Sequence, residues 1–285
     1  MGQKTVLTDT FTDTTLPIIY DDPIMSAGTL ILADLTHSLG GVNGLIGNGA
    51  LIPNIAWSTA NQLVAGAPGQ AALSLPVQAG AAFGSATLPF AERTPKGGMH
   101  VVRSQVNDVT NIAYSLNLPA PVLTYVLSNP NHSYYFSVWQ YVTRAAVDAT
   151  AGLFMLGNNT SNYAFYGVAS ANFPTTTPPR LLSSTTGSSG LAVGASKLQI
   201  AESAYTGTAD TIRAGLYFPS GVGGAFNPLH KGWSGVFYRI LLEDLSISGR
   251  TAAAVKSMDD ALYATATAAG GKLYGDTFTD PAGYP

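Results

Sequence analysis

The chain contains no cysteine, so neither a disulfide framework nor a thiolate metal site can form. It is also poor in charge, because charged residues make up 10% of its 285 residues, against about 25% in an average soluble domain. The formal net charge of −3 offers no basic surface, which argues against nucleic acid as a partner. No apolar run approaches the length of a bilayer span, so we expect no membrane insertion.

The scarcity of charge also bears on the surface of the protein. A free monomer normally keeps charged side chains for solubility. A surface this poor in charge indicates either burial against other subunits or a neutral extracellular protein. The first residues, from Met1 to Val6, lead directly into polar sequence and contain no apolar signal-peptide core. We therefore expect a protein that is made in the cytoplasm of its host cell without a signal peptide.

Threonine, valine and tyrosine are plentiful, whereas glutamate and lysine are scarce, which argues against a helical protein. Short apolar runs alternate with turn signals at a spacing typical of a β-sandwich. The strongest strand is predicted over residues 133–144, and its apolar residues on both faces require cover on both sides. One face carries Tyr134, Phe136 and Val138, and the other carries Tyr135, Trp139 and Tyr141. Other strands are predicted at 28–35, 86–91, 98–106, 112–118, 122–127, 152–156, 163–169, 198–204 and 212–218.

A long strand followed by a helix is predicted near the C-terminus. Residues 234–248 suit a pleated strand, with Val236, Tyr238, Ile240 and Leu242 on one face and Phe237, Arg239, Leu241 and Glu243 on the other. A helix is predicted over about 251–268, with Thr251 as its N-cap and the Gly270–Gly271 pair at its end. Its apolar stripe is formed by Val255, Met258 and Leu262.

This strand and helix resemble the closing elements of concanavalin A-like, laminin-G-like sandwich domains. The resemblance covers residues 240–263 and rests on the run EDLSISGRT at 243–251, on Val255 and on Ala261-Leu262-Tyr263. A second resemblance lies at residues 8–13, where TDTFTD is similar to the opening of many sandwich domains in tailed-bacteriophage virion proteins. Together they imply an all-β, concanavalin A-like jelly-roll sandwich with one C-terminal helix. We expect an extended segment at 1–25, the sandwich and its helix at 26–269, and a tail at 270–285.

The same resemblance implies a non-enzymatic structural subunit of a tailed-phage particle, located in the virion. The subunit would belong to a tail, fibre, baseplate or capsid decoration, and its partners would be copies of itself and other virion proteins. One alternative is a carbohydrate-binding module that attaches the particle to a host-surface glycan. A further alternative is a glycan hydrolase of the sandwich fold.

Residue patterns for catalysis or metal binding are missing from the sequence. Sugar-cleaving sandwiches need two carboxylates on one strand face, but Glu243 and Asp244 are adjacent and would point to opposite faces. Glu92 and Glu202 have no acidic neighbour at alternating spacing, so we expect all these carboxylates to be solvated or to bind turns. The four histidines are widely spread and form no zinc motif. We predict no catalytic residue, no metal site and no cofactor.

Two sets of residues remain as candidates for binding. For a glycan, loop asparagines and an aromatic platform are offered by Asn158, Asn159, Asn162, Tyr163 and Trp233. For assembly, the tail carries Leu273, Tyr274, Phe278 and Tyr284, which are too many large apolar groups for a solvated segment.

The tail also repeats a phrase from the start of the chain. DTFTD occurs at 9–13 and again at 276–280, so Phe278 would dock as Phe11 does. We expect the tail to be an assembly element covered by a neighbouring subunit. Cover by the same subunit, with the tail as a last edge strand, is the alternative.

Overall fold

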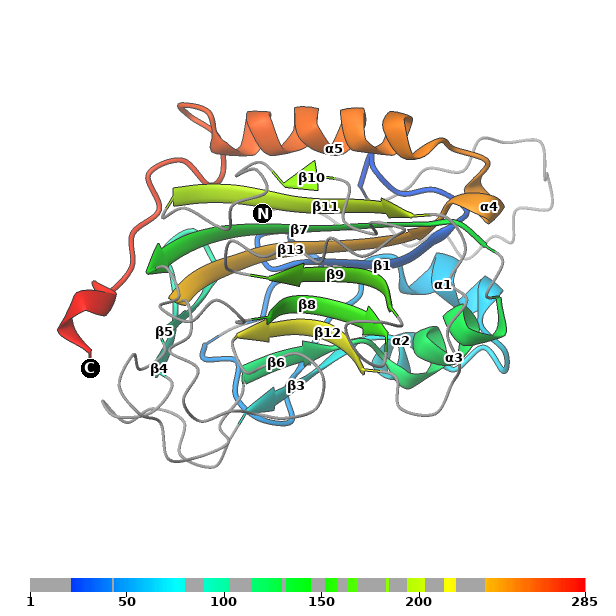
Figure 1. Ribbon diagram of the computed structural model, residues 1–285. Helices are drawn as coiled ribbons and strands as arrows, with labels where there is room; N and C mark the ends of the chain where they lie inside the picture. The colour runs from blue at the N-terminus through cyan, green and yellow to red at the C-terminus, as the bar shows by residue number, and fades with distance from the viewer. Residues whose placement is uncertain are drawn as a thin grey trace, which may run out of the picture.

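The computed structural model describes residues 22–42, 44–79, 90–102, 114–129, 132–144, 152–157, 163–168, 183–184, 194–202, 213–218 and 234–284. Within these ranges the chain is mostly β, as predicted, and its strands form two antiparallel sheets (Figure 1). The larger, seven-stranded sheet has the order β10-β11-β7-β13-β5-β4, with β1 also paired to β13. Its strands are β1 (Thr29–Asp34), β4 (Phe90–Arg93), β5 (Met99–Val102), β7 (Tyr134–Arg144), β10 (Ser183–Ser184), β11 (Gly194–Glu202) and β13 (Ser234–Asp244).

The smaller, six-stranded sheet has the order β2-β3-β6-β12-β8-β9. The strands predicted at 152–156 and 163–169 are confirmed as β8 and β9, which pair antiparallel with one another. The strands of the smaller sheet are β2 (Leu51–Ile52), β3 (Leu75–Ala79), β6 (Tyr114–Asn117), β8 (Gly152–Gly157), β9 (Tyr163–Val168) and β12 (Arg213–Phe218).

The prediction for β7 is confirmed, including its two covered faces. Tyr134, Phe136 and Val138 belong to the apolar core that the two sheets share. Tyr135 and Trp139 point the other way and pack under the C-terminal segments. Aromatic and β-branched residues suit a pleated strand that is buried on both sides, which explains why this strand could be found from the sequence.

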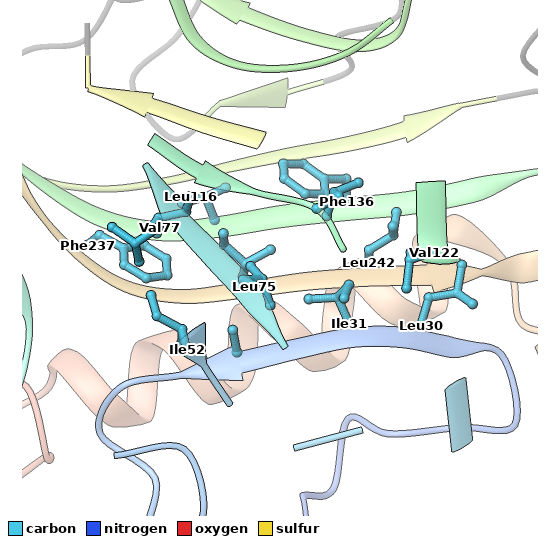
Figure 2. Packing of buried hydrophobic residues seen from close by; sticks show 14 of the residues in the cluster. Leu30, Ile31, Ile52, Leu75, Val77, Leu116, Val122, Phe136, Phe237 and Leu242 are labelled. Carbon is cyan, nitrogen blue, oxygen red and sulfur yellow. The ribbon is translucent and has the colours of Figure 1, made fainter. Parts of the chain in front are cut away.

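The shared core lies between the two sheets and is closed at one end by two helices. Figure 2 shows Leu30 and Ile31 from β1, Phe237 and Leu242 from β13, and Leu75, Val77 and Leu116 from the facing sheet. Val122 and Val126 of α3 (Ala120–Ser128), with Ala60 of α1 (Trp57–Leu63), extend this cluster. Every one of these side chains is buried, so the apolar area removed from water stabilises the contact between the sheets.

Strand β13 departs from the predicted alternation in its middle. The register against β7 shifts between Phe237 and Arg239, which is a β-bulge. As a result Tyr238 and Arg239 both lie on the outer face, and Ile240 and Leu242 lie in the shared core with Phe237. The predicted grouping of Val236 and Tyr238 with Ile240 and Leu242 is therefore wrong.

The strand also ends earlier than predicted, at Asp244. The Asp244 carboxylate accepts hydrogen bonds from the backbone N–H groups of Ser246 and Ile247 and so caps the short helix α4 (Leu245–Ser248). Gly249 then closes α4 in the left-handed conformation, with φ of 69°.

Four helices were not predicted: α1, α2 (Gly69–Ala72), α3 and α4. Residues 122–127 were predicted as a strand and lie in α3 instead. Pro121 stands in the first turn of this helix, where its missing N–H costs no hydrogen bond. Val122 and Val126 are one helical turn apart and both are buried, a spacing that also fits a helix. None of the helices in the described ranges combines the length and apolar character needed to cross a bilayer.

The predicted C-terminal helix is confirmed as α5 (Ala252–Thr267), with the Thr251 side chain capping the N–H of Ala254. It lies along the outer face of the larger sheet (Figure 1). The predicted stripe is wrong at Met258, which is 39% exposed. The buried helix positions are Val255, Asp259 and Ala266, with Leu262 half-buried between them. A strict apolar pattern could not identify Asp259, because its place on this face depends on hydrogen bonds.

Candidate functional site

The C-terminal tail turns back onto the end of α5 immediately after the helix. A Cβ atom at Gly271 would lie 2.3 Å from the backbone oxygen of Thr265, so only glycine allows this close approach. Two residues later the N–H of Leu273 donates to the carbonyl oxygen of Ala266 at 2.8 Å. The Leu273 side chain is buried against Trp139, Val236 and their neighbours.

Beyond this turn the tail is held to the larger sheet by side-chain hydrogen bonds. The hydroxyl of Tyr238 donates to Asp276 at 2.7 Å, and the N–H of Lys96 donates to the other oxygen of the same carboxylate at 3.0 Å. The N–H and hydroxyl of Thr279 donate to the two oxygens of Glu92, at 2.7 and 2.8 Å. Each of these hydrogen bonds joins the tail to a residue at least 38 positions away in the sequence.

The end of the tail is fixed by Arg144 of β7. One guanidinium nitrogen donates to the carbonyl oxygens of Pro281 and Tyr284, at 2.8 and 2.9 Å. Pro281 is buried and begins the 3-10 helix η2 (Pro281–Gly283), which Asp280 caps through the N–H of Ala282. The tail therefore runs along its own subunit in an irregular conformation and adds no edge strand.

A histidine lies beneath the tail. His100 is fully buried and shares hydrogen bonds with Glu92 at 2.8 Å and with the Thr143 hydroxyl at 2.9 Å, and the Phe278 ring lies 5.0 Å from it. Burial lowers the pKa of His100, even though Glu92 acts to raise it. Thr, His and Glu in this order could in principle form a nucleophilic relay. The His100 side chain has no exposed surface, and Thr143 is also buried.

A pocket of about 260 Å³ opens between the tail, α5 and the outer face of the sheet. Five aromatic residues form much of its lining, and their rings come from two strands, the helix and the tail. The Tyr141 and Phe278 rings lie 5.4 Å apart and are inclined to one another by 49°. The lining residues are Gln140, Tyr141, Tyr238, Tyr263, Thr267, Leu273, Tyr274, Gly275, Asp276 and Phe278.

The carboxylate of Asp276 and the hydroxyl of Thr267, two polar groups of this pocket, are already hydrogen-bonded within the protein. Both oxygens of Asp276 accept hydrogen bonds, and the Thr267 hydroxyl donates to the carbonyl oxygen of Tyr263 at 2.9 Å. Burial raises the pKa of Tyr263 to about 12, and burial together with Asp276 raises the pKa of Tyr238. The tyrosines consequently stay neutral at physiological pH. Alternation along β7 directs the side chain of Gln140 to the face opposite Trp139 and Tyr141, away from the pocket.

The adjacent carboxylates of β13 are buried and not solvated, and Asp244 fits the other expected alternative because it binds the turn at Ser246 and Ile247. Glu243 forms an ion pair with Arg250, whose guanidinium also donates to the carbonyl oxygen of Ile24 at 2.7 Å. Asp244 accepts from the hydroxyl of Tyr125 at 2.8 Å and lies 2.6 Å from a ring nitrogen of His132. Each carboxylate has a donor as its partner instead of a second carboxylate. Glu92 is bound to His100 and the tail, and its side chain is only 25% exposed.

Among the predicted assembly residues, the structure brings three together. Leu273, Tyr274 and Phe278 all line the pocket. The cover over Leu273 and Phe278 comes from the same chain, Tyr284 is half-buried, and Tyr274 remains 55% exposed. Of the predicted glycan-binding residues, Tyr163 begins β9. Asn158, Asn159, Asn162, Trp233 and the assembly candidate Phe11 lie outside the described residues.

Sequence reasoning missed Tyr141, Tyr238, Tyr263 and Asp276 as members of one site. Tyr141 lies on the face of β7 that alternation predicts, but the place of Tyr238 beside it depends on the bulge in β13. Tyr263 and Asp276 are brought to the same place by the turn at Gly271, for which the sequence carries only the glycine pair as a signal.

Three exposed apolar side chains lie in one stretch of the sequence. Leu39, Leu45 and Leu51 are 54%, 52% and 45% exposed, and all three belong to the segment that leads into β2. Strand β2 is an edge strand of the smaller sheet. An apolar segment at a sheet edge is a surface that other chains can cover.

Comparison with known proteins adds no assignment: no family model, no curated protein and no solved structure matches the chain. Within the described residues, no group of three or more histidine or acidic side chains is placed to hold a metal ion. Function must therefore be inferred from the contacts and surfaces of the chain itself.

Proposed function

We propose that this protein is a non-enzymatic structural subunit of a tailed-phage particle, with a concanavalin A-like jelly-roll sandwich as its fold. It works by contact with copies of itself and with other virion proteins. The observation that carries the proposal is the exposed leucine segment, Leu39–Leu45–Leu51, on a chain that is 10% charged.

The leucine segment has the chemistry of a subunit contact. Interface cores are depleted in charged residues, and burial of apolar surface stabilises association by about 25 cal/mol per Å² before ordering costs. The segment ends in β2, which is an edge strand among the strands that the structure describes, and an edge strand presents backbone groups that a second chain can use. We assign the same segment of a second copy as its first partner, because an apolar patch on a symmetric oligomer meets itself across a two-fold axis.

The buried charges favour a structural role over a catalytic one. Glu243 is paired with Arg250, Asp244 caps α4, and Asp259 accepts from Trp139. Each of these carboxylates holds together elements of its own chain. A hydrolase of the sandwich fold would instead direct two carboxylates at one substrate.

The test is to place charge on the leucine segment. Leu45→Glu with Leu51→Glu should convert an oligomer to a monomer in light scattering and should prevent incorporation into particles, as detected by mass spectrometry. Met258→Glu is the matched control, because Met258 is a similarly exposed apolar residue on α5. The proposal fails if the double variant, with an unchanged circular dichroism spectrum, assembles as the parent chain does.

A further inference from the structure

The pocket under the tail combines aromatic rings with a negative charge. Tyr141, Tyr238, Tyr263, Tyr274 and Phe278 contribute to its lining. The faces of such rings carry partial negative charge and attract cations. A lining of this kind can recognise either a flat apolar surface, such as a sugar ring, or an organic cation.

The carboxylate of the pocket is not balanced by a positive side chain. Asp276 accepts hydrogen bonds from the hydroxyl of Tyr238 and from the backbone N–H of Lys96, both of which are neutral donors. No ion pair joins Asp276 to a charged group within the described residues. The neighbouring His100 has a lowered pKa because it is buried, and it stays neutral at physiological pH. The pocket therefore carries a net negative charge.

The hydrogen-bonding groups of the pocket distinguish between the two kinds of ligand. A sugar needs donors and acceptors for its hydroxyls, but the carboxylate of Asp276 and the hydroxyl of Thr267 are already bound within the protein. A quaternary ammonium group needs no hydrogen bonds and is attracted by ring faces and by negative charge. These conditions favour the cation.

The aromatic cluster beside the pocket already holds two cations of the protein itself. The guanidinium carbon of Arg239 lies 4.6 Å from the centre of the Trp139 ring, and the Lys272 ammonium lies 5.9 Å from it. Tyr263 connects this cluster to the pocket. It lines the pocket, and its ring centre lies 5.5 Å from that of Trp139 in a T-shaped contact. The outer face of the sheet thus combines aromatic rings with cations beside the pocket, and both cations are also paired with the carboxylates of Asp22 or Asp34.

We propose that this pocket binds an organic ammonium group, with the aromatic rings around it and Asp276 as the counter-charge. The volume of about 260 Å³ is below the range of about 300–1,000 Å³ that is typical of pockets for drug-sized molecules. It suits a head group of the size of choline. A free amine and an ammonium group carried by a larger molecule would be bound through the same contacts.

The direct test is titration of the full chain with choline, in which binding is measured by calorimetry or by the shifts of the tyrosine resonances in NMR spectra. The control ligand is the neutral isostere of choline, in which carbon replaces the quaternary nitrogen. We expect choline to bind at least about tenfold more tightly than the isostere. Equal binding of the two would show a merely apolar pocket, and tighter binding of a methyl glycoside would show a sugar site. Either result would overturn the proposal, as would the absence of choline binding.

Two variants place the binding in this pocket. Tyr274→Ala should weaken choline binding about threefold to thirtyfold, whereas Tyr274→Phe, which keeps the ring, should bind as the parent does. Tyr274 is more than half exposed, so neither substitution should change the melting temperature. Asp276→Asn should reduce the preference for choline over the isostere. Unchanged choline binding by Tyr274→Ala and Asp276→Asn would assign the ligand to another site.

Discussion

The two faces of the larger sheet are buried in different ways. The inner face meets the smaller sheet through aliphatic and aromatic side chains (Figure 2). The outer face is covered by α5, by the tail and by residues 22–25, and there the apolar clusters are interrupted by buried charges. Arg239 lies among Asp22, Asp34 and the Trp139 ring, with 2% of its surface exposed.

The buried charges of the outer face attach the two terminal parts of the chain to the larger sheet. Contacts on the outer face join residues far apart in the sequence, such as Arg239 to Asp22 at 3.1 Å and Lys272 to Asp34 at 2.8 Å. Burial alone would raise the pKa of Asp34, but the charge and hydrogen bond of Lys272, with Thr36 and Arg239, hold it below its usual value. Apolar packing tolerates exchange of similar volumes, whereas a buried charge depends on one partner. The outer face should therefore be the more sensitive to a single polar substitution.

The largest effect should follow from breaking the ion pair between Glu243 and Arg250. Arg250→Met leaves the fully buried Glu243 without its partner, which should cost about 3–5 kcal/mol in the free energy of unfolding. Lys256→Met is the control, because the Lys256–Asp260 pair is exposed and its loss should cost about 0–1 kcal/mol. Urea denaturation measures both values. Equal losses in the two variants would contradict the account of the outer face.

The second prediction compares how much the core between the two sheets and the contact of α5 with the larger sheet contribute to the free energy of unfolding. Leu242→Ala, in the core between the sheets, should cost about 2–5 kcal/mol. Leu262→Ala should cost less, because Leu262 is half-buried, and Met258→Ala should change stability by about 0.5 kcal/mol or less. The same denaturation measurement applies to all three variants. A larger loss for Leu262 than for Leu242 would place the main core under α5.

The smallest effect should be a pH dependence of the tail contact. Burial lowers the pKa of His100, and bonds from His100 and Thr279 lower the pKa of Glu92 although burial opposes this. Because both folded-state pKa values are depressed, the unfolded chain binds more protons than the folded chain as the pH falls. The melting temperature should therefore decrease between about pH 6.5 and pH 4.

His100→Gln is the variant that isolates this effect. Glutamine keeps a donor for Glu92 and an acceptor for Thr143 but does not titrate. We expect the melting temperature of this variant to depend less on pH in the upper part of the range. An unchanged pH dependence would assign the acid sensitivity to other groups.

Local patterns in the sequence were enough to predict strands β7 and β13 and the helix α5. Alternation with apolar residues on both faces identified β7, and the Thr251 cap with the glycine pair identified the ends of α5. The bulge at Tyr238 and the end of β13 at Asp244 could not be predicted, because each depends on the partner strand or on a side-chain cap. Helix α3 was mistaken for a strand because short apolar runs fit both structures.

The candidate site was predicted only in part. The expectation was that a neighbouring subunit covers the large apolar residues of the tail, with cover by the same subunit as the alternative. The structure shows Leu273 and Phe278 packed on their own subunit. Asp276 and the three tyrosines of the sheet and helix meet in space through a turn that no periodic pattern describes.

The most direct test of the proposed role is electron cryo-microscopy of purified particles of the phage that is proposed to carry this chain. We expect the subunit in the particle, with Leu39, Leu45 and Leu51 at a contact between copies and the tail docked on its own sheet. The account would be contradicted if the chain is missing from purified particles, or if these leucines face solvent while another surface makes the contacts.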